Sequence, residues 1–291
     1  MEIKEIEKGI YVILDSTNIP VIETDKGLLL IDAGIDKDKG KKIRRILEEA
    51  GVTPKYLLLS HHHADHTGGA QFLKEYFGLS VISSNDEKVF IENPELEPTY
   101  LSQGAKPIRQ FLNKWVLSNS VEVNYTTSEI SFEDVEFLDL SGHSIGMVGV
   151  RAGDFVFAGD AFFSKEVLEK YRVPYFYDFE KFRERMQFLK GMEFKYIVPS
   201  HGDIYTKEEA IAILDLNIAT LNKIEEQIID LLKEEKSVEE IVEGLQVLPH
   251  DIIVYTLIES SIKSILNSLV EREIITYEVK DGRLKYNVRR V

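Results

Sequence analysis

The 291-residue chain contains no cysteine, which excludes disulfide bonds and thiolate metal sites. Any metal ion that it binds must therefore be held by histidine and carboxylate side chains. Histidine is scarce as well, because the chain has seven, and four of them lie between positions 61 and 66. No apolar run approaches membrane-spanning length, and the amino-terminal segment alternates apolar and polar residues without a signal-peptide pattern. These absences predict a cytoplasmic protein without a membrane segment.

Positive charge is in short supply. The sequence has 35 Lys+Arg against 50 Asp+Glu, a formal net charge of −15. From Tyr205 onward it has 11 Lys+Arg against 17 Asp+Glu, a balance of −6, so neither half is a basic module. Affinity for a phosphate backbone comes from Lys and Arg that displace counterions, so the composition argues against a general polyanion binder.

Strand and helix signals alternate over the first 204 residues. Strands are predicted within residues 9–15, 20–34, 55–60, 135–144, 148–160 and 194–203, with a turn at Asp25-Lys26-Gly27 between two apolar runs of the second segment. A helix over 36–51 ends at Gly51, and a second helix is predicted to begin at His66. The segment 87–121 breaks this rhythm and reads as a partly helical insertion that carries Trp115, the only tryptophan.

The pattern changes after residue 204. Apolar residues at steps of three and four from Leu214 to Leu231 predict a long amphipathic helix. A short helix with a Ser237–Glu240 capping box follows, then a third helix over 254–269 that His250 is predicted to cap or flank. A hairpin is expected around Asp281-Gly282. Three helices and a hairpin are the order of a winged helix, so we expect two domains, 1–204 and 205–291.

The histidine cluster follows a buried strand in the stretch "YLLLSHHHADHTGGA". In extended chain, alternate residues share a face, so His61 and His63 can ligate one ion while His62 points away. Asp65 and His66, just past the strand, can turn toward a second ion nearby. An expression tag would sit at a terminus, and this cluster is internal. The cluster therefore predicts metal binding.

Three further polar residues follow apolar strands in the same way. They are His143 in "FLDLSGHSIG", Asp160 in "FVFAGDAFF" and His201 in "YIVPSHGD". Small neighbours leave room for such side chains to approach a shared ion. Each residue alone is better read as a hydrogen-bonded histidine or a turn aspartate, but their joint occurrence at strand ends predicts a single metal centre.

These motifs together resemble those of a known family. "HHHADH" matches the H-x-H-x-D-H signature of the metallo-β-lactamase superfamily, and Asp32 in "LLLIDAG", His143, Asp160 and His201 match its other motifs in order. The resemblance spans about Leu28 to Asp203. It implies an α/β fold, a four-layer αββα sandwich with a two-metal site along one edge, followed here by a mainly helical, winged-helix-like domain.

The resemblance also implies a role for each matched residue. One ion would be held by His61, His63 and His143, and the other by Asp65, His66 and His201. Asp160 would bridge both ions, and Asp32 would orient the ligands by hydrogen bonds. Asp65 and Asp160 are thus the implied catalytic residues. Nitrogen and oxygen ligands suit Zn²⁺ first, and also Mn²⁺ or Fe²⁺. The flavo-diiron branch usually has Glu where this chain has His63, which disfavours redox chemistry.

The implied function is hydrolysis of a small ester, thioester or lactone by a hydroxide that the dinuclear centre holds. An endoribonuclease or phosphodiesterase of the same superfamily is the alternative, and its RNA contacts would fall on Lys280, Arg283, Lys285, Arg289 and Arg290. A binding or dimerisation module with a vestigial site is a third hypothesis. A homodimer through the C-terminal domain is compatible with the pattern. Substrate, native metal, oligomeric state and the roles of 87–121 and of the aromatic loop 171–182 stay open.

Overall fold

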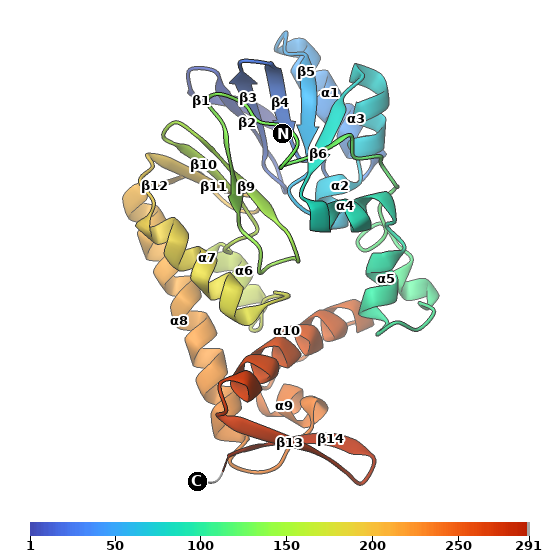
Figure 1. Cartoon of the computed structure of the whole chain (residues 1–291), viewed down its shortest axis with the longest axis vertical. Coiled ribbons are helices and arrows are strands. Elements are labelled where there is room, and N and C mark those ends of the chain that lie inside the picture. The colour runs from blue at the N-terminus through green and yellow to red at the C-terminus, as the bar shows by residue number, and fades with distance from the viewer. Residues whose placement is uncertain (290–291) are drawn as a thin grey trace.

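The structure, a computed structural model, describes residues 1–289 and contains two large β-sheets that pack face to face (Figure 1). The first sheet has seven strands in chain order: β1 (Glu2–Glu7), β2 (Ile10–Leu14), β3 (Ile19–Thr24), β4 (Gly27–Ile31), β5 (Pro54–Leu58), β6 (Ser80–Ser83) and β7 (Tyr125–Thr126). The second runs in the order β12 (Tyr205–Thr206), β11 (Tyr196–Pro199), β10 (Phe155–Gly159), β9 (Val148–Ala152) and β8 (Glu136–Asp139).

Both sheets are mixed. Neighbouring strands from β1 to β4 are antiparallel, whereas β4, β5, β6 and β7 are parallel. In the second sheet only β10 and β11 are parallel neighbours. The parallel strands matter for function, because their carboxyl ends lie at one edge, where the connecting loops can bring polar side chains together.

Helices lie on the outer faces of the sheets or beyond the sheets, in the insertion and the C-terminal part (Figure 1). They are α1 (Lys37–Glu49), α2 (Ala64–Thr67), α3 (Ala70–Phe77), α4 (Asn85–Glu92), α5 (Leu96–Leu101), the 3₁₀ helix η1 (Arg109–Phe111), α6 (Lys165–Lys170), α7 (Phe179–Gly191), α8 (Lys207–Leu231), α9 (Val238–Gly244) and α10 (Ile252–Glu271). Strand β4 shows how the layers arise from the alternation of side chains. Leu29 and Ile31 pack between the sheets with Phe157, while Leu30 packs outward with Ile43 of α1. The predicted α/β layering is confirmed.

The helix that was predicted to begin at His66 is two helices, α2 and α3, separated by Gly68 and Gly69. Both glycines abut the connection between β4 and α1. A Cβ atom at Gly68 would collide with the carbonyl oxygen of Ile35, and one at Gly69 with that of Ala33. The break therefore lets the histidine-rich loop lie directly against the loop that carries Asp32.

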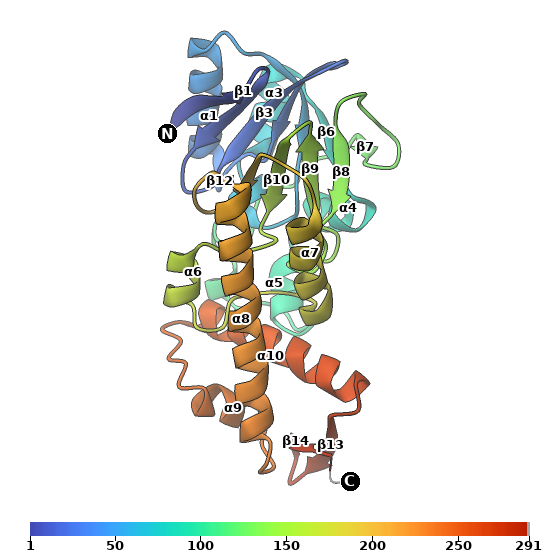
Figure 2. The same ribbon diagram turned by 90° about the vertical axis from the view of Figure 1, so that its left-hand side faces the viewer.

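The C-terminal part has the predicted element order, with α8, α9 and α10 followed by the hairpin of β13 (Ile275–Lys280) and β14 (Arg283–Val288). The predicted capping box at Ser237 and Glu240 is present. The hairpin turns at Asp281 and Gly282, both with positive φ, as a two-residue turn of this hand requires. His250 flanks α10, where it pairs with the N-cap residue Asp251. Helix α8 runs from the sheets to the far end of the molecule (Figure 2).

One apolar cluster joins this helical part to the second sheet. It contains Val156 of β10 and Phe182 of α7 together with Leu214 of α8 and Ile262 of α10, all of them buried. Helix α10 also supports the insertion, because Ile253 and Leu257 pack against a small cluster of Leu101, Phe111 and Val116. The C-terminal helices therefore cover apolar surface of the sheet region.

Helix α10 is the one helix within residues 1–289 that is long and apolar enough to cross a membrane, with a mean hydropathy of 1.2. The sequence prediction that no such segment exists is corrected to that extent. The buried core helix of a folded protein meets the same criteria of length and composition. Ile258, Ile262 and Leu266 of α10 are buried in the apolar cluster described above. Helix α10 is accordingly weak evidence for a membrane segment.

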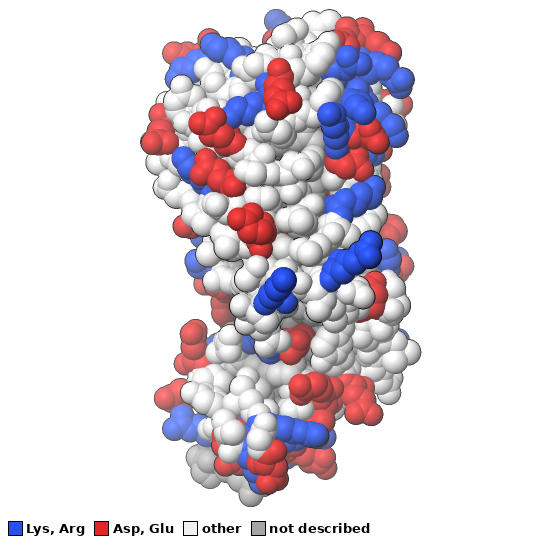
Figure 3. All heavy atoms as spheres, turned by 90° about the vertical axis from the view of Figure 1, so that its right-hand side faces the viewer, with Lys and Arg blue, Asp and Glu red and all other residues white. Residues whose placement is uncertain are grey.

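The insertion shows apolar side chains on its surface. Leu96, Ile108, Leu112 and Trp115 are at least a third exposed, and Trp115 most of all. On the side of the molecule where α5 lies in Figure 1, Lys and Arg gather at the upper right among Asp and Glu, and the middle is mainly uncharged with a few isolated charges (Figure 3).

Candidate metal centre

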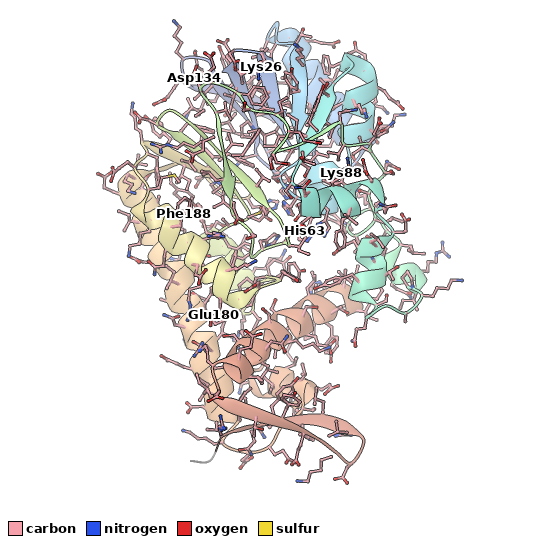
Figure 4. The ribbon with its side chains drawn as sticks, viewed as in Figure 1. Lys26, His63, Lys88, Asp134, Glu180 and Phe188 are labelled. Carbon is pink, nitrogen blue, oxygen red and sulfur yellow. The ribbon has the colours of Figure 1, made fainter. Side chains whose placement is uncertain are left out.

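The seven predicted ligands converge at one edge of the two sheets. His61, His63, Asp65 and His66 follow β5 of the first sheet, while His143 follows β8, Asp160 follows β10 and His201 follows β11 of the second. Figure 4 shows His63 at this edge near α4, with Lys26 and Asp134 at the opposite end of the sheets. Residues that are up to 140 positions apart in the chain therefore meet because the loops that follow these strands share an edge.

Three histidines form the first group of donor atoms. His63 Nδ1 lies 3.0 Å from His61 Nε2 and 3.1 Å from His143 Nε2. Nitrogens that surround one zinc ion tetrahedrally at about 2.0–2.1 Å are separated by roughly 3.3 Å. The three ring nitrogens are thus spaced as ligands of a single ion would be.

Asp65, His66 and His201 form the second group. Asp65 Oδ2 lies 3.1 Å from His201 Nε2 and 3.6 Å from His66 Nε2. The remaining ring nitrogens are already engaged, because His66 Nδ1 donates to Asp32 and His201 Nδ1 donates to the carbonyl oxygen of Ser16 at 2.6 Å. These bonds hold both Nδ1 atoms as donors and direct both Nε2 atoms at the site, where a metal ion can replace a proton.

Asp160 lies between the two groups. Its Oδ2 is 3.5 Å from His143 Nε2, 3.6 Å from His201 Nε2 and 3.8 Å from His66 Nε2. One carboxylate oxygen therefore faces donors of both groups, which is the position of a bridging ligand.

Unpaired buried atoms test whether a metal fits these residues. His66 Nε2 and Asp160 Oδ1 are buried without a hydrogen-bond partner among the described residues. A buried polar atom without a partner costs free energy, so both atoms require a ligand. Histidine nitrogen and carboxylate oxygen are donors that Zn²⁺ accepts. The residues fit divalent metal ions.

The protonation states of the histidines are also consistent with a metal site. Burial lowers the pKa of His61 well below its ordinary value, and burial together with His63 lowers that of His143 to about 3 against the opposing charge of Asp160. Both rings are therefore neutral, as metal ligands must be. In the second group burial is outweighed by carboxylates: Asp160 and Asp65 raise the pKa of His201 to about 10. That half of the site favours positive charge.

Asp32 supports the second group, in the role that the resemblance implied. It is fully buried and has a φ of 65°, a left-handed conformation that is uncommon for aspartate. Its Oδ1 accepts the backbone N–H of Ser60, and its Oδ2 accepts the Ser60 hydroxyl and His66 Nδ1, each at 2.8 Å. Three hydrogen bonds thus hold the Asp32 side chain despite its strained backbone, and the one from His66 orients a predicted ligand.

His62 points away from the ligands, as predicted, but its partners were not foreseen. Its Nδ1 lies 2.5 Å from Glu87 Oε2 and its Nε2 lies 3.0 Å from Glu97 Oε2, and the ring stacks on Phe90. Burial opposes protonation, but Glu87 and Glu97 raise the pKa of His62 to about 10, so it is a cation between two carboxylates. The one sequence signal that pointed to these glutamates is that segment 87–121 interrupts the alternation of strands and helices.

The aromatic loop 171–182 divides into two kinds of residue. Phe176, Phe179 and Phe182 are buried in the apolar cluster that joins the C-terminal helices to the second sheet. Tyr175 differs, because its ring centre lies 5.6 Å from that of His63 and 5.5 Å from that of His143. The three phenylalanines are core packing, Tyr177 is exposed, and Tyr175 forms a wall of the three-histidine group, with Phe182 behind His143 at 6.4 Å between ring centres.

A pocket of about 440 Å³ opens at the second group of ligands. Asp65 and His201 line it, with Ile35 just before α1, Lys42 of α1 and Trp115 of the insertion. A small molecule held in this pocket would therefore contact the insertion on one side and the metal ligands on the other.

Comparisons with known proteins agree with this geometry. A family model described as "Metallo-beta-lactamase superfamily" matches residues 12–201. The chain is 30% identical over 146 residues to a probable metallo-hydrolase of Bacillus subtilis, covering 48% of this chain and 63% of that protein. It is 30% identical over 145 residues to a hydroxyacylglutathione hydrolase of Haemophilus influenzae, covering 48% and 64%. The chain thus spans less than two thirds of each relative.

The fold is also shared with solved structures. A metallo-beta-lactamase family protein from Thermus thermophilus superposes with a TM-score of 0.71 at 17% identity. The match covers 98% of this chain and 100% of that one. The common fold therefore includes the helical C-terminal part.

Proposed function

This chain belongs to the metallo-beta-lactamase superfamily and is a hydrolase of that superfamily, and from this premise we propose that it cleaves a small thioester with two divalent metal ions, zinc by default. The observation that carries the proposal is the convergence of seven donor side chains in two groups that share Asp160. Esters and lactones, whose carbonyl chemistry is similar, are the neighbouring substrate classes.

When bound, such an ion pair acidifies a water molecule and polarises the scissile carbonyl group. His61, His63 and His143 would hold one ion, Asp65, His66 and His201 the other, and Asp160 both. Asp65 would also act on the substrate side, since its side chain is about a third exposed in the pocket. Nearby His66 and His201 outweigh burial and lower its pKa, so its carboxylate can accept a hydrogen bond from a water molecule and orient it.

The choice of a thioester rests on the relatives. One of them is named a hydroxyacylglutathione hydrolase, and a hydroxyacylglutathione is a thioester. The pocket supports a compact substrate with an apolar portion, because Ile35 and Trp115 line it beside Asp65.

The endoribonuclease alternative has less support. Three of the basic hairpin residues pair with carboxylates: Lys280 with Glu235, Lys285 with Glu240 and Arg289 with Glu273. Cations that are already neutralised release few counterions from RNA. Arg290, which was also assigned to this cluster, lies outside the described residues. The vestigial-site hypothesis conflicts with the complete set of donors.

A substrate panel tests the proposal. The zinc-loaded protein should hydrolyse an S-hydroxyacyl thioester with a kcat/KM at least about a hundred-fold above that for a phosphodiester or single-stranded RNA. Chelation should abolish the activity, and added zinc should restore it. A preference for RNA would establish the alternative instead, and full activity without metal would overturn the metal mechanism.

Replacing Trp115 tests the pocket. Trp115→Ala should raise KM for the thioester about five-fold with little change in kcat, because an aromatic contact contributes about 1 kcal/mol to binding. Leu112→Ala is the matched control, since Leu112 is an exposed apolar residue of the same insertion that is absent from the pocket lining. Equal effects of the two substitutions would show that Trp115 does not contact the substrate.

The finer assignments for the C-terminal part belong to the same proposal. We propose that residues 205–291 form a winged-helix-like unit that serves as a packing or dimerisation element and does not bind nucleic acid. A cytoplasmic location likewise stays a prediction.

A further inference from the structure

Glu87 is a fully buried carboxylate with four hydrogen bonds, in the first turn of α4. Its Oε2 accepts the backbone N–H of His62 at 2.9 Å and also faces the His62 ring. Its Oε1 accepts the Ser144 hydroxyl at 2.5 Å and the Gly146 backbone N–H at 2.9 Å. Four bonds fill the accepting capacity of a carboxylate, so Glu87 is fully committed to these partners.

The partners belong to the two loops that carry the three-histidine group. His62 stands between His61 and His63 in the chain, and Ser144 directly follows His143. The first loop follows β5 of one sheet, and the second loop follows β8 of the other. Each of the three histidines is therefore adjacent in sequence to a residue that bonds Glu87, and the carboxylate links the sheets at this edge.

We propose that Glu87 is a positioning residue that sets the distance between these loops and thereby the metal affinity of the three-histidine group. The inference rests on the proposed metal centre and is independent of the substrate. Glu87 contacts none of the seven ligand side chains through a hydrogen bond, so it acts through His62 and Ser144.

The segment 87–121 extends this support. Glu97 bonds the far side of the His62 ring, and Phe90 stacks on its face. Three residues of the insertion thus contact the His62 side chain, which lies in the loop that carries His61 and His63. The segment that carries Trp115 of the pocket lining thus also contacts the loop of the three-histidine group.

The second group of ligands has other supports. His66 is held by Asp32 at 2.8 Å, and His201 by the carbonyl oxygen of Ser16 at 2.6 Å. Neither bond involves Glu87. A positioning role therefore predicts a selective effect on one ion, whereas a merely structural role predicts lower stability without such selectivity.

The test is a metal titration of Glu87→Gln against a competing chelator. Glutamine keeps the size of the side chain, but its amide nitrogen cannot accept a hydrogen bond, so one set of partners is lost. One of the two stepwise dissociation constants should rise about ten- to a hundred-fold, the usual effect of removing an outer support of a metal ligand, while the other stays within about two-fold. Cadmium-113 NMR of the loaded protein should show that the weakened site is the one with three histidine ligands, and not the one with two histidines and Asp65.

Glu95→Gln is the matched control. Glu95 is exposed, lies on the same insertion and makes no ion pair within residues 1–289, so the same loss of charge should leave both constants unchanged. Ser144→Ala, which removes a single bond, should shift the same constant by a smaller factor, and it decides the question should Glu87→Gln not fold. Equal weakening of both ions, or of neither, overturns the proposal, whether or not the protein hydrolyses thioesters.

Discussion

Asp160→Ala should reduce the metal content from two ions to fewer than one per chain and lower kcat/KM by more than a hundred-fold. The reason is the position of Oδ2, which lies within 3.8 Å of donor nitrogens in both groups. Without it, each group has only three protein ligands, and the positive charges of the two ions would face each other without a bridging anion. Elemental analysis after metal-replete purification, together with thioester kinetics, measures both effects.

Asp154→Ala is the matched control for this prediction. Asp154 immediately precedes β10 and Asp160 immediately follows it, so the two aspartates flank the same strand at opposite ends. Asp154 is exposed, and its substitution should change neither metal content nor activity. Two tightly bound ions in Asp160→Ala would show that the carboxylate does not bridge them.

Truncation after Asp203 should give an aggregating protein. Helices α8 and α10 contribute Leu214, Leu221, Ile262 and Ile265 to the apolar cluster that also buries Phe182 of α7. Their removal would expose a continuous apolar surface on the sheet region, and large exposed patches of this kind cause association. Size-exclusion chromatography and binding of a hydrophobic dye would detect it. A truncated protein that stays monomeric and active on small esters but loses RNA cleavage would instead support the nucleic-acid role of the tail.

A pair of point substitutions in the full chain provides a graded control. Leu214 is fully buried on α8, and Leu214→Ala should lower the free energy of unfolding by about 2–5 kcal/mol. Leu216, two positions further on, is 39% exposed. Leu216→Ala should change the free energy of unfolding by less than about 0.5 kcal/mol. Chemical denaturation measures both values. Similar small changes would mean that α8 does not stabilise the sheet region.

The local sequence was sufficient to locate the candidate ligands. Each of the seven follows an apolar strand or lies in the loop just after it, and the end of a strand can be read from alternation and small residues. The superfamily resemblance then paired them into two groups, and the structure brings the same residues together. The order of elements in the C-terminal part could also be predicted from the sequence, because helix caps and helical periodicity depend on neighbours within a few residues.

Only the tertiary structure decided what surrounds these ligands. Glu87 and Glu97 lie 25 and 35 positions from His62, in a segment whose sequence shows no periodicity that would reveal its partner. The break between α2 and α3 at Gly68 and Gly69 also depends on a distant segment. The backbone of Ala33 and Ile35 lies so close that a side chain at either glycine would collide with it. Sequence patterns report which face of an element is buried and where the element ends. They do not report which distant side chain faces a buried charge, because that depends on how loops from different strands pack at the edge of the sheets.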